Sequence, residues 1–578
     1  MCGLLGRLSY AAPLPANGLG AALATLAHRG PDGQGFWRSA CGRIELGHTL
    51  LSTVVEAGAD QPITDAHGNT VVANAEFYGH ETIRGWLTAR GEALASRSDC
   101  AILAPLYRSF GAEMFSALRG EFAFVLWDPA RQRLWAARDR FGIKPLYYAE
   151  IGNVFYVASE VKTLFALGVP ARWDREALAI YQAAHLPAGR TLFAGVHSVP
   201  PGHYLEVTAE GIILHRYWAY PTAAETLADP VSTVREGLIE AIDLRRRSHV
   251  AVGTYLSGGL DSTSIVGIQR VLSDQRITAL TVTFPGSELD ETPTARASAA
   301  AIGGVELIEV RACEEALAVC FESAVLGSEA PCSNAHGAAK YMLSARAKAE
   351  GLTVVLTGEG ADEIFWGYPH LTQAWVGSVP HWLADDDGDT ALWRELYQPE
   401  LAEFARSQSA SRILRDNLAA LEQGPTEGVA GSAWLWTRTV LPNYLLRTLG
   451  DGVEMANGIE GRQPFLDHHL AEAVIPLGEQ WKLRGGHPKA LLRMAVQSFV
   501  PPEVVRGSKR PFLSPPAKGA LRGRLLALAA AHAGEIPAFD ADAVMRIVKK
   551  LSTAGQDMDP MLFELAALGV LQKHFACS

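Results

Sequence analysis

A cysteine directly follows the first methionine of the chain, and this position gives it a specific chemistry. Cysteine is small enough for the preceding methionine to be removed, which would leave Cys2 as the mature N-terminus. A free α-amine has a pKa of about 8 and could act as the base for the thiol of the same residue. A cysteine at position 2 is by itself nearly always incidental, but this one is accompanied by polar motifs at His28–Gly33, Asn74–Glu76, Ser98–Asp99 and Arg138–Tyr147.

The loop Ser257–Ser262, with the sequence SGGLDS, lies where a predicted strand ends and a predicted helix begins. Small residues let backbone amides surround an anion, and the helix N-terminus adds the positive end of its dipole. The two serines can donate hydroxyl groups, whereas Asp261 is suited to hold Mg²⁺. The loop lacks the GK[ST] of a Walker loop. The alternative interpretation is a glycine-rich turn without a ligand, which the strand–loop–helix setting disfavours.

A second acidic loop, Thr357–Glu363 (TGEGADE), follows a predicted strand at 352–356. In a parallel sheet, this loop and the SGGLDS loop open on the same carboxyl edge, where ligands bind. Asp362 could therefore join Asp261 on Mg²⁺. The alternative is a helix N-terminus, where the helix dipole stabilises acidic residues. That alternative explains one acidic residue more readily than the three in this loop, Glu359, Asp362 and Glu363.

The elements that must position these residues fall into two groups. Residues 1–160 read as short alternating strands broken by Gly, Pro and Asp, with helices at 20–28 and 99–110. This pattern predicts a β-rich α+β domain with sheet packed on sheet.

From about residue 230 strands and helices alternate, which is typical of a parallel sheet with helices on both faces. The chain from about 375 is mostly helical by period, and the Pro/Gly-rich stretch 186–205 is predicted to cross between the domains. We set the domains at 2–210 and 211–578. The predicted elements are helices at 231–249, 263–273, 290–302 and 338–351 and strands at 250–256, 277–284, 305–310 and 352–358.

Composition excludes several classes of protein. The chain has 578 residues, of which 48% are hydrophobic and 20% charged, so it is globular and long enough for several domains. Its net charge of −11 argues against nucleic-acid binding, and no apolar run approaches the roughly 20 residues of a membrane span. The N-terminal segment lacks the basic-then-apolar order of a signal peptide. Seven dispersed cysteines without a CxxC pair disfavour disulfides or structural zinc and predict a cytoplasmic protein.

Taken together, the motifs resemble those of glutamine-hydrolysing asparagine synthetases and their natural-product relatives over nearly the whole length. MCG, HRGPDG, RGEFAFVLWD, ARDRFGIKPLYY and ASEVKTL resemble the amidohydrolase half. SGGLDS, LTGEGADEIFWGY and EGRQPFLDHHL resemble the synthetase half. The resemblance implies an N-terminal-nucleophile amidohydrolase domain of stacked antiparallel sheets flanked by helices. An α/β ATP-pyrophosphatase domain with a helical C-terminal part would follow it.

In the first domain, the resemblance implies that the Cys2 thiolate attacks the side-chain amide of glutamine and releases ammonia. Asn74 and the backbone N–H of Ala75 would hold the oxyanion. Asp99 would bind the α-ammonium group of glutamine, with Glu76 nearby.

In the second domain, the resemblance implies that ATP and Mg²⁺ adenylate a small-molecule carboxylic acid and that ammonia from an internal tunnel converts the adenylate to an amide. Glu359 matches the proton acceptor of that step. Lys489 matches a lysine that stabilises charge on the departing phosphates; the alternative is a solvated lysine at the start of a helix. A homodimer is a further expectation from the family. The residues implied for ATP and pyrophosphate are Leu256, Ser257, Gly258, Gly259, Asp261, Ser262 and Gly358, with Asp261 and Asp362 on the metal.

The glutamine site departs from the family pattern at two positions. Leu50 stands where the family has an arginine that clamps the α-carboxylate of glutamine, and a leucine offers no charge-assisted hydrogen bond. Ala75 replaces a glycine, which would cost about 1 kcal/mol if the backbone there needs a positive φ. These changes indicate a weak glutaminase or a donor other than ordinary glutamine, unless another loop supplies the clamp. Arg43 is nearby in sequence, and whether it substitutes stays open.

The acceptor region departs as well. The segment Ser328–Gly337 contains no arginine, although true asparagine synthetases hold aspartate there with residues that include one. Trp366 and Gly452 also replace common family residues. We therefore expect an acceptor that is larger or less charged than aspartate.

Four functions compete at this point. The first is an ATP-dependent amidotransferase for an acid other than aspartate, and the second is a true asparagine synthetase with relocated clamps. The third is an ATP-driven amide or lactam cyclase, against which the retained Cys2 counts. The fourth is a non-catalytic protein on the same fold, which the intact SGGLDS, Glu359, Asp362 and Lys489 disfavour.

Overall fold

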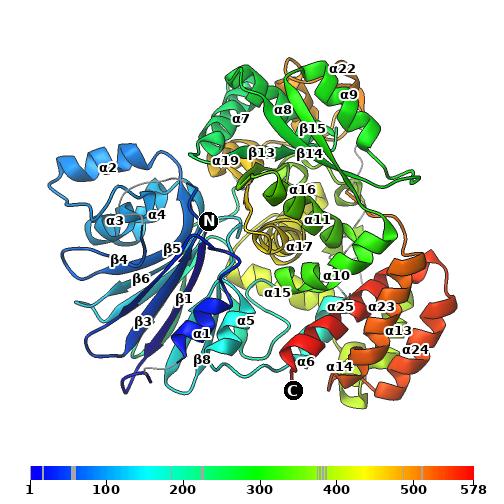
Figure 1. Ribbon diagram of the computed structural model, residues 1–578, viewed down its shortest axis with the longest axis horizontal. Helices are drawn as coiled ribbons and strands as arrows, with labels where there is room; N and C mark the ends of the chain where they lie inside the picture. Colours follow the sequence, from blue (N-terminus) through cyan, green and yellow to red (C-terminus); the bar gives the residue numbers. More distant parts are fainter. Residues whose placement is uncertain are drawn as a thin grey trace. The chain divides into compact units, whose positions relative to one another are not determined.

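The computed structural model describes residues 2–15, 18–53, 60–183, 185–222, 227–373, 387–485, 487–508 and 512–578, with short pieces between 375 and 383. The chain divides into two compact units (Figure 1). Unit 1 comprises Met1–Arg172 and Ala188–Ala219, and unit 2 comprises Trp173–Pro187 and Tyr220–Ser578. The stretch 186–205 is thus not a simple crossing, because the chain from Ala188 onward belongs to unit 1 and contributes the strand Val196–Ser198 and the start of the strand His203–Thr208 there.

Unit 1 consists of two antiparallel six-stranded sheets. One has the order β10-β8-β9-β1-β3-β2 and the other β12-β11-β7-β6-β5-β4. The strands of the first sheet are β1 (Cys2–Ser9), β2 (Gly33–Arg38), β3 (Ile44–Leu50), β8 (Tyr147–Ile151), β9 (Val154–Ala158) and β10 (Val196–Ser198). Those of the second are β4 (Ile63–Thr64), β5 (Thr70–Phe77), β6 (Gly120–Asp128), β7 (Arg133–Arg138), β11 (His203–Thr208) and β12 (Gly211–Arg216).

Alternation along the strands divides the interior of unit 1 into two cores. Val72 and Val125 face a core between the sheets, together with Leu4 and Leu46 of the other sheet. The residue next to Val72, Val71, faces a second core on the opposite side of its sheet. That second core is covered by α2 (His80–Ala89), η1 (Asp99–Ile102), α3 (Leu103–Phe110) and α4 (Met114–Ala117). The predicted packing of sheet on sheet, flanked by helices, is confirmed.

Unit 2 is built on a five-stranded parallel sheet with the order β15-β14-β13-β16-β19. The chain runs outward from β13 through β14 to β15 and then returns to β16 on the other side of β13. Loops after β13 and β16 therefore open at a switch point of the sheet, where a crevice forms. The strands are β13 (Val252–Tyr255), β14 (Ile277–Thr283), β15 (Val305–Arg311), β16 (Val354–Leu356) and β19 (Glu460–Arg462).

The helices of the α/β part lie close to their predicted ranges, with one difference at the site. Helix α8 (Leu260–Leu272) begins three residues earlier than predicted, so Asp261 and Ser262 belong to its first turn. The other helices of this part are α7 (Pro230–Arg246), α9 (Thr292–Ile302), α10 (Glu314–Ser328), α11 (His336–Ala349) and α12 (Ala361–Phe365). Of these, α10 was not predicted, and α12 corresponds to the alternative interpretation of the acidic loop as a helix N-terminus.

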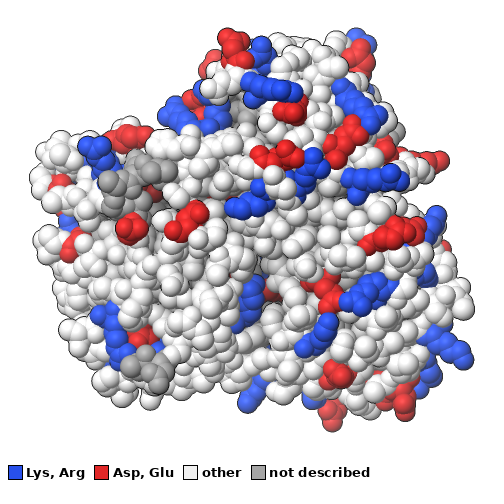
Figure 2. Space-filling model, viewed as in Figure 1, with Lys and Arg blue, Asp and Glu red and all other residues white. Residues whose placement is uncertain are grey.

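The C-terminal part is helical, as predicted, and ends in α23 (Gly519–His532), α24 (Ala541–Thr553) and α25 (Asp559–Phe575). Within the described residues, no helix combines the length and apolar character needed to cross a membrane. On the face drawn in Figure 2, acidic and basic side chains are interspersed, which fits the modest net charge of −11.

Candidate active site

The first candidate site lies in unit 1, where Cys2 begins strand β1. Cys2 is buried, and its backbone nitrogen donates a hydrogen bond of 3.0 Å to Oδ1 of Asn74 on β5. In a chain without Met1, this nitrogen is the α-amine. The buried Nδ2 of Asn74 has no hydrogen-bond partner among the described residues. A buried, unsatisfied N–H beside a thiol is suited to a developing oxyanion.

An arginine–glutamate pair anchors the carbonyl side of Cys2. The Nε of Arg29 donates to the Cys2 carbonyl oxygen at 3.2 Å, and its Nη1 donates to Oε1 of Glu160 at 3.0 Å. Burial alone would raise the pKa of Glu160, but the charges of Lys162, His28 and Arg29 hold it well below its usual range. The sequence marked both residues through HRGPDG and ASEVKTL without assigning them a role.

Asp99 begins η1 and lies beside the last residue of β5, the strand that carries Asn74, Ala75 and Glu76. Its Oδ2 accepts a hydrogen bond from the Phe77 backbone N–H at 2.9 Å, and its Oδ1 accepts one from the N–H of Cys100 at 2.8 Å. The Asp99 carboxylate is thereby held against Phe77, the residue that follows Glu76 in the strand. Ala75 lies inside the regular strand, paired with Phe122 of β6, so its backbone is extended and the penalty of a positive φ does not arise.

Leu50 lies directly opposite Cys2 in the antiparallel pairing of β1 with β3. Side chains of directly opposed residues lie on the same face of a sheet, so Leu50 borders the thiol. Arg43 does not take its place. It precedes the other end of β3, roughly 20 Å away by the rise per residue of a strand, and donates to Gln132 and to the Tyr10 carbonyl.

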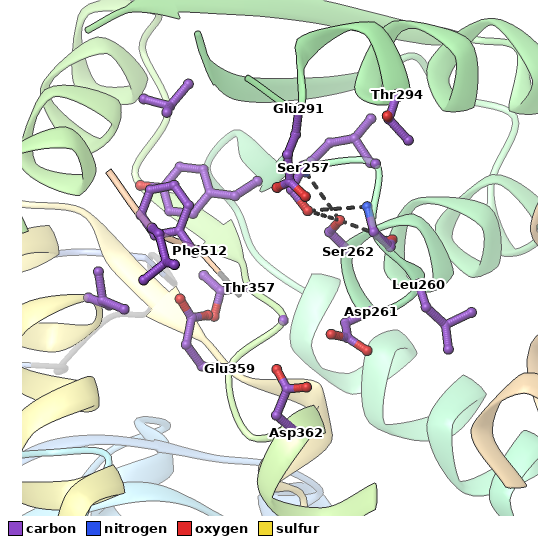
Figure 3. Close-up of a pocket in the computed structure, with 18 of the residues that line it drawn as sticks. Ser257, Leu260, Asp261, Ser262, Glu291, Thr294, Thr357, Glu359, Asp362 and Phe512 are labelled. Carbon is purple, nitrogen blue, oxygen red and sulfur yellow. Dashed lines mark hydrogen bonds between the residues drawn. The ribbon is translucent and has the colours of Figure 1, made fainter. Parts of the chain in front are cut away.

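The second candidate site is a cavity of about 840 Å³ in unit 2, at the switch point of the parallel sheet (Figure 3). Both motif loops and Lys489 line it, so the structure brings together all the residues predicted for ATP, metal and proton transfer. These lining residues are Leu256, Ser257, Gly258, Gly259, Asp261, Ser262, Gly358, Glu359, Asp362 and Lys489.

The SGGLDS loop has the geometry of an anion site. Gly258 has a φ of +84°, and a Cβ there would lie 2.6 Å from the backbone of the Thr294–Ala295 segment, so only glycine fits. The hydroxyls of Ser257 and Ser262 lie 3.1 Å apart (Figure 3). Helix α8 starts at this point without a side-chain cap. Its first amides are therefore available to phosphate oxygens.

Lys489 links the two carboxylates predicted to bind the metal. Its Nζ lies 2.6 Å from Oδ2 of Asp261 and 2.6 Å from Oδ1 of Asp362. Figure 3 shows the two carboxylates directed toward each other from the first turns of α8 and α12. Gly367 permits this approach, because a Cβ there would clash with both Asp362 and Lys489.

This donor set fits Mg²⁺, which binds through one or two carboxylates together with phosphate oxygens and water. The described residues contain no group of three or more His, Cys, Asp or Glu side chains that could hold a metal alone. Asp261 and Asp362 would thus hold the ion jointly with a nucleotide. There it would neutralise phosphate charge.

Glu359 is paired with a lysine that the sequence did not single out. The Nζ of Lys340 on α11 donates to Oε1 of Glu359 at 2.7 Å and lies 3.4 Å from Oε1 of the buried Glu454. Burial raises the pKa of Glu359, but the charge and hydrogen bond of Lys340 outweigh burial and lower it. Glu359 is therefore ionised at neutral pH, as a proton acceptor must be.

Of the residues suspected to shape acceptor binding, only some reach the cavity. Ser333, Asn334 and His336 line it, all from or next to the segment Ser328–Gly337. Trp366 and Gly452 do not line it. Trp366 packs against Leu371 and Ala433, and Gly452 lies against Gly327 and Ser328, where a Cβ would clash with backbone.

Comparisons with known proteins agree with this arrangement. Residues 233–572 match the family described as asparagine synthase, and residues 1–218 match the glutamine amidotransferase domain. Amidase chry2 of Gibberella zeae is 32% identical, with 85% of this chain and 84% of the relative covered. Amidase chyE of Penicillium rubens is 33% identical, with 84% and 83% covered. The glutamine-hydrolysing asparagine synthetase 3 of Bacillus subtilis is 29% identical, with 89% and 87% covered.

The asparagine synthase match spans more than half of the chain. The amidotransferase match precedes it and covers all strands of the two sheets of unit 1. The motif resemblance read from the sequence is confirmed. The chain belongs to the asparagine synthetase family, as a glutamine-hydrolysing ligase with an N-terminal class II glutamine amidotransferase domain.

Proposed function

We propose that the chain forms a carboxamide from a carboxylic acid other than aspartate, with ATP as the source of energy and glutamine as the source of nitrogen. A carboxylate oxygen of the acid attacks the α-phosphorus of ATP, and pyrophosphate leaves. Ammonia then attacks the acyl carbon, AMP leaves, and the nitrogen loses a proton to Glu359. The products are the amide, AMP, pyrophosphate and glutamate.

The observation that carries this proposal is the single cavity lined by the SGGLDS loop, Glu359, Asp362 and Lys489. Amides at the start of α8 and the Lys489 ammonium stabilise negative charge on the departing phosphates. Glu359 lies across the same cavity with a lowered pKa, so it can accept a proton where the amide forms. An anion site and an ionised base in one cavity suit an adenylation followed by an amine attack.

The nitrogen-releasing half of the proposal rests on Cys2 and Asn74. The Cys2 thiolate attacks the amide carbon of glutamine, ammonia leaves, and water then releases glutamate from the thioester. Asn74 Nδ2 is the hydrogen-bond donor for the oxyanion of both steps. The retained pair disfavours the cyclase alternative, in which the amine is part of the substrate and no thiol is needed.

A true asparagine synthetase is the second candidate function. It is favoured by the relatives from Bacillus subtilis that bear this name, which cover most of the chain. It is disfavoured by the lack of an arginine in Ser328–Gly337.

The test is to incubate the protein with ATP, Mg²⁺ and candidate acids, with either glutamine or ammonia, and to measure pyrophosphate release and product mass. We expect amide products from acids other than aspartate. Asparagine as the preferred product would overturn the choice of acceptor, and no pyrophosphate with any acid would overturn the enzymatic proposal. Cys2→Ala should abolish turnover with glutamine and retain turnover with ammonia, whereas loss of both would contradict the two-site scheme.

A further inference from the structure

Beyond the two motif loops, one side of the unit 2 cavity is built from aromatic rings. Tyr368 and His370 stack with centroids 5.1 Å apart and an interplanar angle of 18°, and the His370 and Trp436 centroids are 4.2 Å apart. His336 and Tyr444 form a second cluster, with centroids 5.6 Å apart and 3.1 Å between Nε2 and the hydroxyl. All five side chains line the cavity, and we call them the aromatic wall: His336, Tyr368, His370, Trp436 and Tyr444.

Four segments that are distant in sequence supply this wall. They are the start of α11, the turn η3 (Pro369–Thr372) with the residue before it, helix α16 (Gly428–Val440) and the π-helical turn η5 (Leu441–Leu445). Leu441, Leu445 and Leu449, spaced four residues apart, line the cavity beside Tyr444. Spacing of four places side chains on one helical face, so this stripe extends the wall with apolar surface.

The aromatic wall adjoins the groups proposed for catalysis. The Trp436 Nε1 donates to Oε1 of Glu363, at the end of the TGEGADE loop, at 3.2 Å. His336 lies one helical turn before Lys340 on α11, and Lys340 holds Glu359. An acceptor acid whose apolar part packs on the aromatic wall would thus keep its carboxylate in the part of the cavity where Glu359 and the two motif loops meet.

The wall carries no positive charge at neutral pH. Burial lowers the pKa of His336 to about 4. Burial likewise lowers the pKa of His370 to about 4, against the opposing charge of Asp362. Both imidazoles are therefore neutral.

The basic side chains among the described lining residues are already engaged. Lys340 is paired with Glu359, and Lys489 is paired with two aspartates. Arg493 donates to the backbone carbonyls of Pro488 and Gly507 at 3.0 and 2.9 Å. A second carboxylate on the acceptor would have to displace one of these partners to gain a cation, and a buried charge without a partner is costly.

We infer that the aromatic wall selects an aromatic carboxylic acid with no second anionic group as the acceptor, with its ring against Trp436 and Tyr444. Aromatic rings gain offset-stacked and edge-to-face contacts beyond the area that they bury, which a saturated ring of the same size does not. This inference rests on the proposed adenylating function. It names Trp436 as a residue that determines specificity.

Matched acids test the inference through ATP–pyrophosphate exchange, which needs no nitrogen donor. Benzoate and 3-phenylpropionate are compared with cyclohexanecarboxylate, 3-cyclohexylpropionate and aspartate. We expect kcat/KM for the better aromatic acid to exceed that of its saturated partner at least tenfold and that of aspartate at least a hundredfold. Equal rates for aromatic and saturated acids, or preference for aspartate, overturn the inference and leave adenylation intact. If none of these acids, aspartate included, supports ATP–pyrophosphate exchange, both proposals are overturned.

Variants of Trp436 separate specificity from folding. Trp436→Leu should raise the KM for the aromatic acid at least tenfold and leave the KM for ATP within twofold, and Trp436→Phe should recover most of the loss. Trp86→Leu is the matched control, because Trp86 is 40% exposed in unit 1 and stacks on Phe110. Melting followed by circular dichroism checks folding. Equal losses for aromatic and saturated acids in Trp436→Leu would indicate a structural role and overturn the assignment.

Discussion

Lys340 and Glu359 form a partly buried ion pair in the wall of the unit 2 cavity, with the ammonium nitrogen 2.7 Å from the carboxylate. Lys340 also lies over the Tyr255 ring, 4.4 Å from its centroid. Burial lowers the pKa of Lys340, but Glu359 and Glu454 outweigh burial and raise it. The pair therefore stays charged over the physiological range, and the lysine holds the proposed base in its ionised form.

Replacing Lys340 by methionine should move the acidic limb of the pH–rate profile to higher pH. Without the ammonium, burial alone acts on Glu359 and raises its pKa, so the carboxylate becomes protonated at a pH where it is normally ionised. The measurement is kcat for ammonia-dependent amide formation from pH 5 to 9, at constant free ammonia. Lys340→Arg should retain the native limb, because it keeps the charge. Lys348→Met, on an exposed position of the same helix, is the control for the loss of a lysine. An unshifted limb in Lys340→Met would mean that Glu359 is not the base.

Periodicity was sufficient to predict the packed antiparallel sheets of unit 1 and four of the five strands of the parallel sheet, because alternation and parallel-sheet patterns are local. The start of α8 was misplaced by three residues, since Leu260, Asp261 and Ser262 read as loop while their backbone continues the helix. The local patterns also did not show that Trp173–Pro187 belong to unit 2 and that the chain then returns to unit 1 at Ala188. That return depends on pairing of Val196–Ser198 with β8, about fifty residues earlier in the chain, which no local pattern encodes.

The predicted site residues were those that stand in contiguous motifs. Lys340, Trp436 and Tyr444 stand in none, and they reach the cavity only because α11, α16 and η5 pack around it. In the sequence, each is only a polar or aromatic residue within a largely apolar helix. Such a residue cannot be distinguished by pattern from one that packs in the hydrophobic core. Conversely, Trp366 was unusual in sequence but lies outside the cavity, because its ring packs under Lys482.

Asn74→Ala should lower kcat for glutamine hydrolysis by about 10²–10³, the usual cost of losing one oxyanion donor. The buried Nδ2 of Asn74 has no competing acceptor among the described residues, so its removal leaves the oxyanion without that bond. The measurement is glutamate release under saturating glutamine. Asn153→Ala, in an exposed turn of the same unit, serves as the matched control. A change of less than tenfold in Asn74→Ala would place the oxyanion elsewhere.

Leu50→Arg should lower the KM for glutamine. The side chain at position 50 lies on the same face as Cys2, so an arginine there begins within reach of a substrate bound at the thiol. A charge-assisted hydrogen bond is worth about 1.5–3 kcal/mol, which corresponds to roughly 10- to 150-fold in affinity. Glutamate release against glutamine concentration gives the KM, and Leu50→Met controls for a long side chain without charge. An unchanged KM with arginine would show that the α-carboxylate is held by another group.

Glu564→Gln should stabilise the protein increasingly as the pH rises from 5 to 8. Burial raises the pKa of Glu564, on α25, to about 8. The folded chain therefore keeps a proton that the unfolded chain releases above about pH 4.5, and the free energy of unfolding falls by up to about 1.4 kcal/mol per pH unit across this window. The glutamine variant lacks that decline.

The measurement is the difference in thermal midpoint between Glu564→Gln and the native chain at pH 5, 6.5 and 8. The Glu564 charge also contributes to the raised pKa values of Tyr181, Cys332, Tyr397 and Tyr444. All four groups stay neutral below pH 8, so none of them changes its charge across this window. Glu400→Gln, at an exposed position, is the control for the replacement of a glutamate by glutamine. A constant difference for Glu564→Gln would mean that Glu564 is ionised in the folded chain throughout this range.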